Sequence, residues 1–222
     1  MNRSGMTRQG GSPRDLVESA VPDRAGRIDV LTEALADRAR ADALVDAVYR
    51  TLETPVGTLL VAATPVGLVR VALPAEDHGA VVAELVSSVG PRVLRAARPL
   101  DPAARALDAY FAGRQRSFDL PLDLRLARGF RREVVRSLAT IDYGTTRGYA
   151  EVAAHLGRPG AARAVGTACA ANPLPLVLPC HRVVRADGTP GDYRGGADLK
   201  IALLAFEAGG GRTEALSLRR GP

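Results

Sequence analysis

The chain has 222 residues, of which 46% are hydrophobic and 24% charged, as in ordinary globular proteins. This composition excludes a disordered, collagen-like or coiled-coil protein, and no apolar run reaches the ~18 residues that a membrane span needs. The first residues lack the apolar core of a signal peptide, so we expect a cytoplasmic protein. Two cysteines, Cys169 and Cys180, are too few for a disulfide framework, and both should be thiols in a reducing compartment.

The net charge of +6 lies entirely in the second half of the chain. Residues 1–126 hold 16 basic and 16 acidic side chains, whereas residues 127–222 hold 14 basic and 8 acidic ones. A basic half favours a polyanionic partner, and nucleic acid is the commonest. Every basic residue except Lys200 is an arginine, so coding bias explains the pattern about equally well.

Residues 1–47 are interpreted as an N-terminal extension. Residues 1–26 are rich in Gly, Pro, Ser and Arg and show no periodicity, so we expect them to be disordered. Between Arg27 and Val48, apolar side chains recur at mostly helical spacing, which predicts an amphipathic helix.

Residues 48–126 are expected to form a small α+β domain. Runs rich in Val, Leu and Thr, separated by Pro-Gly turns, predict a β-meander of Tyr49–Glu53, Thr58–Thr64 and Leu68–Leu73. Helices are predicted over Val81–Val89 and from Asp101, as the N-cap, to Gly113. Alternating apolar residues predict a closing strand over Ser117–Leu124.

Residues 127–212 are expected to form a mostly helical domain, followed by a tail at 213–222. Its first helix is predicted over Phe130–Ile141. Two short helices, Tyr149–Leu156 and Ala161–Ala171, are joined by a four-residue turn containing Gly and Pro. This is the outline of a helix-turn-helix.

The second helix of this pair consists almost wholly of small residues, and Arg163 is its one long side chain. Such a helix can approach another backbone closely, so tight helix packing with a solvated Arg163 is one interpretation. Against a basic background, a slender helix with one projecting arginine also suits insertion into a DNA groove.

The candidate reactive centre follows an apolar run, Leu176–Leu178, that we predict to be a strand. Cys180 there needs a nearby base or positive charge, because only the thiolate is nucleophilic and its unperturbed pKa is about 8.5. His181 and Arg182 offer both, but consecutive side chains on an extended chain point opposite ways. A bridging water could carry the proton, and a distant carboxylate would orient the imidazole. For Cys169 a buried, inert thiol is the default.

The motif Pro179-Cys-His-Arg182 with Val183-Val184 resembles the active site of the O6-alkylguanine-DNA alkyltransferases, or methylated-DNA–protein-cysteine methyltransferases. Other segments match the family in order and spacing: Tyr149, Arg163–Thr167, Asn172–Pro175, Gly191–Gly196, Lys200 and Glu207. The resemblance is dense over residues 143–208 and extends more loosely back to Val48.

The resemblance implies an α+β fold. A small N-terminal β-meander and helix domain, ribonuclease H-like, would precede a mostly helical C-terminal domain with a winged-helix-like helix-turn-helix. It also implies DNA repair by direct, stoichiometric, irreversible transfer of the alkyl group from O6-alkylguanine to Cys180, with O4-alkylthymine left open. The target base would be flipped out of double-stranded DNA, because its oxygen is shielded by stacking. We expect minor-groove binding by a monomer in the bacterial cytoplasm, without metal or cofactor.

The resemblance assigns roles around the cysteine. Cys180 matches the alkyl acceptor, and His181 matches the base that deprotonates it through a water. Glu207 matches the carboxylate that orients His181, and Asn172 matches the residue that braces the turn. Tyr149 matches the residue that helps rotate the nucleotide and contacts the lesion, and it is suited to protonate the leaving guanine.

The resemblance also assigns the DNA contacts and the base pocket. Arg163 matches the finger that fills the gap left by the extruded guanine. Further DNA contacts are expected from Ala162, Gly166, Thr167, Tyr149 and Arg182. The walls of the base pocket are expected from Val183, Tyr193, Arg194 and Gly195.

The chain departs from the family pattern at several positions. Arg131 replaces a usual Gln, and Val135 stands where a Trp is usual. Gly148 replaces the Ser or Thr that caps the helix of Tyr149, and Arg194 occupies the place of a small residue at the pocket lip. None of these departures removes a reacting group.

Three alternative functions are weighed against repair. A sensor that binds alkylated DNA without repairing it would lack the cysteine, which is present as Cys180. A regulator that signals by self-alkylation would carry an extra zinc-binding cysteine domain, and the chain has only two cysteines. A Cys-His hydrolase would need an oxyanion hole, which nothing in the sequence suggests.

Overall fold

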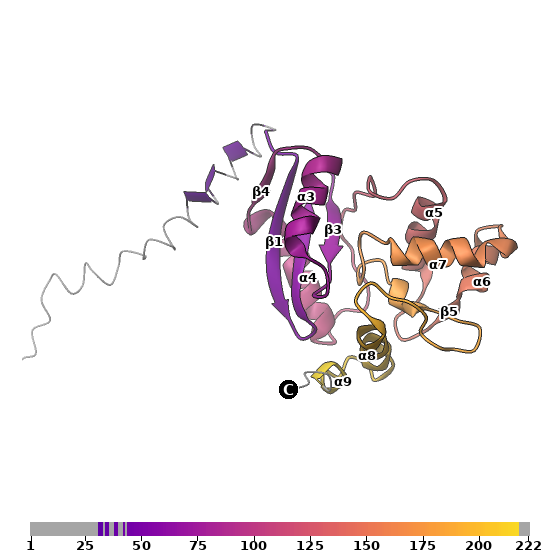
Figure 1. Ribbon diagram of the computed structural model, residues 1–222. Helices are drawn as coiled ribbons and strands as arrows, with labels where there is room; N and C mark the ends of the chain where they lie inside the picture. The colour runs from indigo at the N-terminus through magenta and orange to yellow at the C-terminus, as the bar shows by residue number, and fades with distance from the viewer. Residues whose placement is uncertain (1–30, 33, 36–37, 40–41, 43, 218–222) are drawn as a thin grey trace, which may run out of the picture.

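The protein is composed of two lobes that lie side by side (Figure 1). The computed structural model describes residues 31–32, 34–35, 38–39, 42 and 44–217. The sheet lobe comprises residues 44–126 and the helical lobe residues 127–217. The α+β fold class expected from the sequence is confirmed, with a small sheet first and a helical half second.

The sheet of the first lobe has four strands, β1 (Ala47–Thr54), β2 (Gly57–Ala63), β3 (Leu68–Ala72) and β4 (Val93–Arg95). They lie in the order β3-β2-β1-β4. The first three form the predicted antiparallel meander, and the short β4, which the sequence did not indicate, pairs parallel to β1.

Two helices pack on the sheet, α3 (His78–Ser88) and α4 (Asp101–Phe111). The N-cap of α3 is Asp77, whose carboxylate accepts hydrogen bonds from two backbone N–H groups of the first turn. Val81 and Leu85 of α3 join a separate apolar cluster on the sheet. Helix α4 contributes instead to the larger core that continues into the helical lobe.

Two local predictions in this part of the chain differ from the structure. Asp101 is the first residue of α4 and not its cap, and its Oδ1 accepts a hydrogen bond from Arg50 at 2.8 Å. Ser117–Leu124 is not a strand, because only Leu122 bridges to Leu68, and Pro121 beside it has no N–H for a ladder.

The N-terminal extension is described only in part. Residues 31–32, 34–35 and 38–39 are helical, in line with the amphipathic helix, but the helix does not reach Val48, which lies in β1. Leu31 and Leu35 are exposed. The tail predicted at residues 1–26 lies outside the described residues.

The helical lobe contains α5 (Gly129–Ser137), α6 (Tyr149–His155), α7 (Ala162–Ala170), α8 (Ala197–Ala208) and α9 (Glu214–Ser217). Strands β5 (Arg147–Gly148) and β6 (Val183–Val184) pair in parallel. Short 3₁₀ turns are η1 (Arg98–Leu100), η2 (Leu138–Thr140), η3 (Pro159–Ala161) and η4 (Cys180–Arg182). Helix α9 lies where we expected a tail, and its Leu216 is buried.

The helix-turn-helix consists of α6, η3 and α7, as expected. Gly148 is the N-cap of α6 and has no side chain to cap with, but Glu151 compensates in part, because its Oε2 accepts the Gly148 N–H at 2.6 Å. Gly157 ends α6 with φ of 70°, a left-handed conformation that favours glycine. The departure at Gly148 therefore leaves the helix start intact.

The two lobes are joined by polar contacts as well as by apolar packing. The backbone N–H of Val71 in β3 donates to the carbonyl of Pro173 at 2.8 Å. Arg194 Nη1 donates to Glu76 Oε2 at 3.2 Å, and the hydroxyl of Tyr110 in α4 donates to Glu207 Oε1 in α8 at 2.7 Å. No helix among the described residues is long and apolar enough to cross a membrane.

Candidate active site

The segment before the cysteine is a braced turn and not the predicted strand. Asn172 holds both ends of it: its Nδ2 donates to the Leu178 carbonyl at 2.7 Å, and its Oδ1 accepts the Leu174 N–H at 3.0 Å. Leu178 N also donates to the Leu174 carbonyl at 2.8 Å, and Leu176 has a positive φ of 71°. Apolar side chains favoured a buried strand, but hydrogen bonds within the segment engage the backbone of Leu174 and Leu178 and fold it into a turn.

Cys180 lies at the end of this turn, as the first residue of η4, and is 3% exposed. Burial raises the pKa of the Cys180 thiol, while a hydrogen bond from Asn172 and the positive charge of Lys200 act in the opposite direction. The resting side chain is therefore a thiol, and it needs a base to become a nucleophile.

His181, the next residue, is fully buried and supplies a candidate base. Its Nε2 lies 2.9 Å from Glu207 Oε1, an arrangement that places the ring proton on Nε2. Its Nδ1 is buried and has no hydrogen-bond partner among the described residues. Burial lowers the pKa of His181, although Glu207 opposes this, so the imidazole is neutral and Nδ1 can accept a proton.

Glu207 is the centre of the buried polar network. Besides His181 and Tyr110, its two oxygens accept a two-pronged interaction from Arg182, at 2.8 Å from Nε and 2.9 Å from Nη2. The Gly144 N–H adds a bond of 3.2 Å. Burial raises the pKa of Glu207, but the donors from His181 and Arg182 outweigh it and hold that pKa well below its usual range. The carboxylate is therefore charged and held from several sides.

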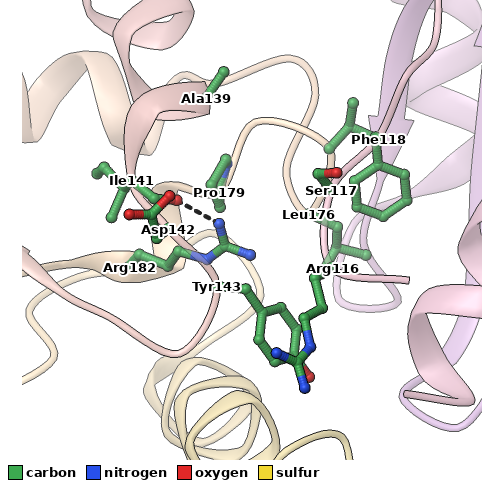
Figure 2. Close-up of a pocket in the computed structure, with 11 residues that line it drawn as sticks. Arg116, Ser117, Phe118, Ala139, Ile141, Asp142, Tyr143, Leu176, Pro179 and Arg182 are labelled. Carbon is green, nitrogen blue, oxygen red and sulfur yellow. Dashed lines mark hydrogen bonds between the residues drawn. The ribbon is translucent and has the colours of Figure 1, made fainter. Parts of the chain in front are cut away.

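Arg182 is not placed as we expected. We predicted a DNA contact, but its side chain is buried, and Nη1 donates to the Ile141 carbonyl at 2.6 Å. Figure 2 shows the guanidinium between Ile141 and the ring of Tyr143, with Pro179 nearby. These residues line a cavity of about 410 Å³. The charge of Arg182 is used inside the protein, to hold Glu207, because leaving it unpaired there would be costly.

Tyr149 and Lys200 lie close to the cysteine on its other side. Burial, with the nearby Cys169 and Cys180, raises the pKa of Tyr149 to about 12, so its hydroxyl keeps its proton. Lys200 is buried, and its Nζ donates to the Val183 carbonyl at 2.6 Å and lies 5.8 Å from the centre of the Tyr149 ring. Lys200 thus ties the backbone after the motif to α8.

The expected pocket residues lie around this centre. Val183 is buried, and its carbonyl accepts the hydrogen bond from Lys200 Nζ. The Tyr193 ring packs edge-on against the His181 ring, with the ring centres 6.5 Å apart. A side chain at Gly195 would collide with Leu73 and Leu199, so the loop touches the sheet lobe closely. Arg194 points to Glu76 and to the Ala170 carbonyl, contacts that hold the loop against both lobes.

Helix α7 presents the expected DNA-binding residues on its outer side. Arg163 and Thr167 are exposed, and Ala162 and Gly166 are half-buried. The opposite side of the helix packs into the core through Val165, Ala168 and Cys169. Burial raises the pKa of Cys169 strongly, which fits the inert thiol expected there.

Two residues of the site went unrecognised in the sequence. Tyr110 lies 97 positions from Glu207, and no local pattern around it indicates a polar role. Glu76 is an acidic residue in a loop, where a solvated side chain is the ordinary case. A hint existed for Glu76 alone, because the apolar strand β3 carries the buried Arg70, which needs an acidic partner.

A helix-turn-helix is typical of DNA-binding proteins, and here it stands in a lobe that also buries a cysteine beside a histidine–glutamate pair. Residues 129–209 match the family described as 6-O-methylguanine DNA methyltransferase, DNA binding domain. Residues 47–124 match the ribonuclease-like domain of the same protein family. The chain belongs to the 6-O-methylguanine DNA methyltransferase family.

Individual relatives agree with this assignment. A methylated-DNA–protein-cysteine methyltransferase of Mycolicibacterium paratuberculosis is 42% identical over 159 residues, covering 72% of this chain and 91% of the relative. The constitutive enzyme of the same name from Bacillus subtilis is 36% identical over 160 residues, covering 72% and 94%. Among solved structures, Mycobacterium tuberculosis OGT in complex with DNA has a TM-score of 0.65 and 36% identity, covering 76% of this chain and 98% of that one.

Proposed function

We propose that this protein repairs DNA by moving the alkyl group of O6-alkylguanine to the sulfur of Cys180, once per molecule. The observation that carries the proposal is the buried His181–Glu207 pair directly beside Cys180, with Nδ1 of the histidine left to accept a proton. Family membership and the relatives' names support the same chemistry. O4-alkylthymine is left open as a second substrate.

The transfer is a direct displacement in which the atoms balance. The thiol proton of Cys180 passes through a water to Nδ1 of His181, and the thiolate attacks the alkyl carbon. The S–C bond forms as the C–O6 bond breaks, and the electron pair of the broken bond goes to guanine. Guanine then takes up one proton, for which the Tyr149 hydroxyl is the proposed donor. The thioether has no route to hydrolysis, so each molecule is consumed.

DNA recognition is proposed to use α7 in the minor groove. Its small residues let the backbone come close, and Arg163 is the exposed side chain able to fill the place of a flipped guanine. The M. tuberculosis relative was crystallised in complex with DNA, and this supports DNA as the partner of the present protein. A monomer in the bacterial cytoplasm completes the proposal.

Intact-protein mass spectrometry tests the reaction. The protein is incubated with a duplex oligonucleotide that carries one O6-methylguanine, and we expect a single gain of about 14 Da on the Cys180 peptide, with no turnover. Cys180→Ser should bind the duplex without gaining mass, whereas Cys169→Ser, the matched control, should react like the unmodified protein. Selective lesion binding without a mass gain would instead favour the sensor.

A comparison of two substrates tests the proposed role of Arg163, which is to fill the place of the flipped guanine. Arg163→Ala should slow transfer from the duplex much more than transfer from free O6-benzylguanine, because only the duplex requires base flipping. Arg136→Ala, at another arginine of the helical lobe, is the control. Equal losses with both substrates would remove the finger role from Arg163.

A further inference from the structure

The sheet lobe reaches into the catalytic network through one side chain. Tyr110 in α4 is fully buried, and its ring contacts Phe111, Phe118, Tyr143 and Phe206, with ring centres 5.2 to 6.1 Å apart. Its hydroxyl leaves this apolar surrounding and donates to Glu207 Oε1 at 2.7 Å. A tyrosine this deeply buried usually finds a partner for its hydroxyl, and here the partner is the carboxylate that holds His181.

The acceptor of this hydrogen bond matters. Oε1, and not Oε2, is the oxygen that lies 2.9 Å from His181 Nε2, and it also accepts Arg182 Nη2 at 2.9 Å. Tyr110 and His181 therefore both donate to the same atom, Glu207 Oε1, and share its negative charge. Burial and the neighbouring Glu207 raise the pKa of Tyr110 well above its usual value, so the hydroxyl donates at every working pH.

We propose that Tyr110 is a positioning residue for alkyl transfer, acting on Cys180 through Glu207 and His181. The inference rests on the proposed function, because it concerns the rate of that transfer. From the side of the sheet lobe, the Tyr110 hydroxyl fixes the position of Glu207 Oε1. Because Oε1 also binds His181 Nε2, this fixes the plane of the imidazole ring. The hydroxyl also withdraws negative charge from the carboxylate.

The charge effect has a definite sign. Without the Tyr110 hydroxyl, more negative charge stays on Glu207, which raises the pKa of His181 and favours a protonated imidazole. At neutral pH this reduces the fraction of molecules whose imidazole is neutral and ready to accept the thiol proton. A higher pH restores that fraction, so the dependence of the rate on pH moves to the alkaline side.

Tyr110→Phe tests the inference, since it removes one oxygen and keeps the ring in the aromatic cluster. The rate of mass gain is measured from pH 6 to pH 9, with O6-methylguanine duplex and with free O6-benzylguanine. We expect transfer about tenfold slower at neutral pH with both substrates, the scale of one lost hydrogen bond to a charged group. The midpoint of the pH profile should rise by about half a unit to one unit, while affinity for the duplex stays unchanged.

Tyr143→Phe is the matched control. Its ring lies 6.1 Å from that of Tyr110, but its hydroxyl is buried without a hydrogen-bond partner among the described residues. This variant loses the same atom from the same cluster and should keep both the rate and the profile of the unmodified protein.

The outcomes separate the possibilities. Tyr110→Phe with an unchanged rate and profile overturns the inference. A rate lowered equally at every pH, together with a lower melting temperature, would mean that Tyr110 is structural, and it also overturns the inference. An unmodified protein that transfers nothing would refute the proposed function itself, which is a different result from either.

Discussion

Each lobe of this protein buries one arginine–glutamate pair, Arg70 with Glu76 in the sheet lobe and Arg182 with Glu207 in the helical lobe. Both arginines are almost fully buried, at 2% and 5% exposure. Both also donate to a backbone carbonyl at 2.6 Å, to that of Val71 and that of Ile141. The chemistry of the two pairs is the same, but their further contacts differ.

Those further contacts decide what each pair does. Glu76 also accepts a hydrogen bond from Arg194, in the loop before α8, so the first pair is linked to the helical lobe. Glu207 also binds His181 and Tyr110, so the second pair orients an imidazole. A buried ion pair is weak evidence for stability or function by itself, and its third partner is the informative one.

The largest effect is expected from Glu207→Gln. The neutral amide leaves the Arg182 charge buried without an anion, which should lower the free energy of unfolding by about 3 to 5 kcal/mol. Loss of an oriented base should slow transfer by about a hundredfold or more. Denaturant unfolding and the mass-gain rate measure the two effects, with exposed Glu214→Gln as control. If Glu207→Gln were as stable and as active as the unmodified protein, the Arg182–Glu207 pair would have no special role compared with the Arg70–Glu76 pair.

Glu76→Gln should cost stability without stopping the reaction. Arg70 keeps a second carboxylate, Glu84, at 3.7 Å, so we expect a loss of about 2 to 3 kcal/mol, less than for an arginine left alone. Transfer from free O6-benzylguanine should stay within about threefold of the unmodified rate, because no contact with Glu207 or His181 changes. If Glu76→Gln slowed transfer as much as Glu207→Gln does, the Arg70–Glu76 pair would also have to support the reaction at Cys180.

Lowering the pH should remove the stabilisation that Glu76 and Glu207 give to the folded protein. Burial raises the pKa of Glu76, but Arg70, the Leu73 N–H and Arg194 together lower it further, so this pKa lies below its usual value, as does that of Glu207. Their stabilisation is therefore complete above the unfolded value of about 4.3 and is lost as pH falls below it. Urea unfolding from pH 7 to pH 3 should show the stability gap between the unmodified protein and Glu207→Gln closing in that window. A constant gap would contradict a depressed pKa of Glu207.

The smallest effect belongs to Arg194→Gln. Its side chain is about one-third exposed, so the ion pair with Glu76 is worth roughly 0 to 1 kcal/mol, and salt should weaken it further. We expect a melting temperature lowered by a few degrees at most. A loss as large as that of Glu76→Gln would show that Glu76 stabilises the protein through Arg194 rather than through Arg70.

The sequence predicts this protein best where local patterns and the fold agree. The meander over residues 49–73 and the helix-turn-helix follow from spacing and turn residues close in the chain, while residue chemistry and the resemblance pointed to Cys180 and His181. The resemblance also supplied Glu207 as the partner of His181, 26 positions away. What it could not supply is a partner from the other lobe, such as Tyr110.

The errors have a common physical cause. The run at Leu176–Leu178 has strand-like side chains, but Asn172 bonds the Leu178 carbonyl and the Leu174 N–H and so holds the segment in a turn. Arg182 was expected to contact DNA, and only the position of Glu207 explains its burial. Contacts made by the folded chain overrode local propensity in both cases.

The bond from Val71 N to the Pro173 carbonyl has a practical consequence. It links β3 to the turn that Asn172 braces, yet it uses no side-chain atom. An alanine scan would leave it intact at every step and would record no coupling there. To see how much the sheet lobe supports the reactive turn, the amide itself must be changed, for instance by an ester at that link in a semisynthetic protein.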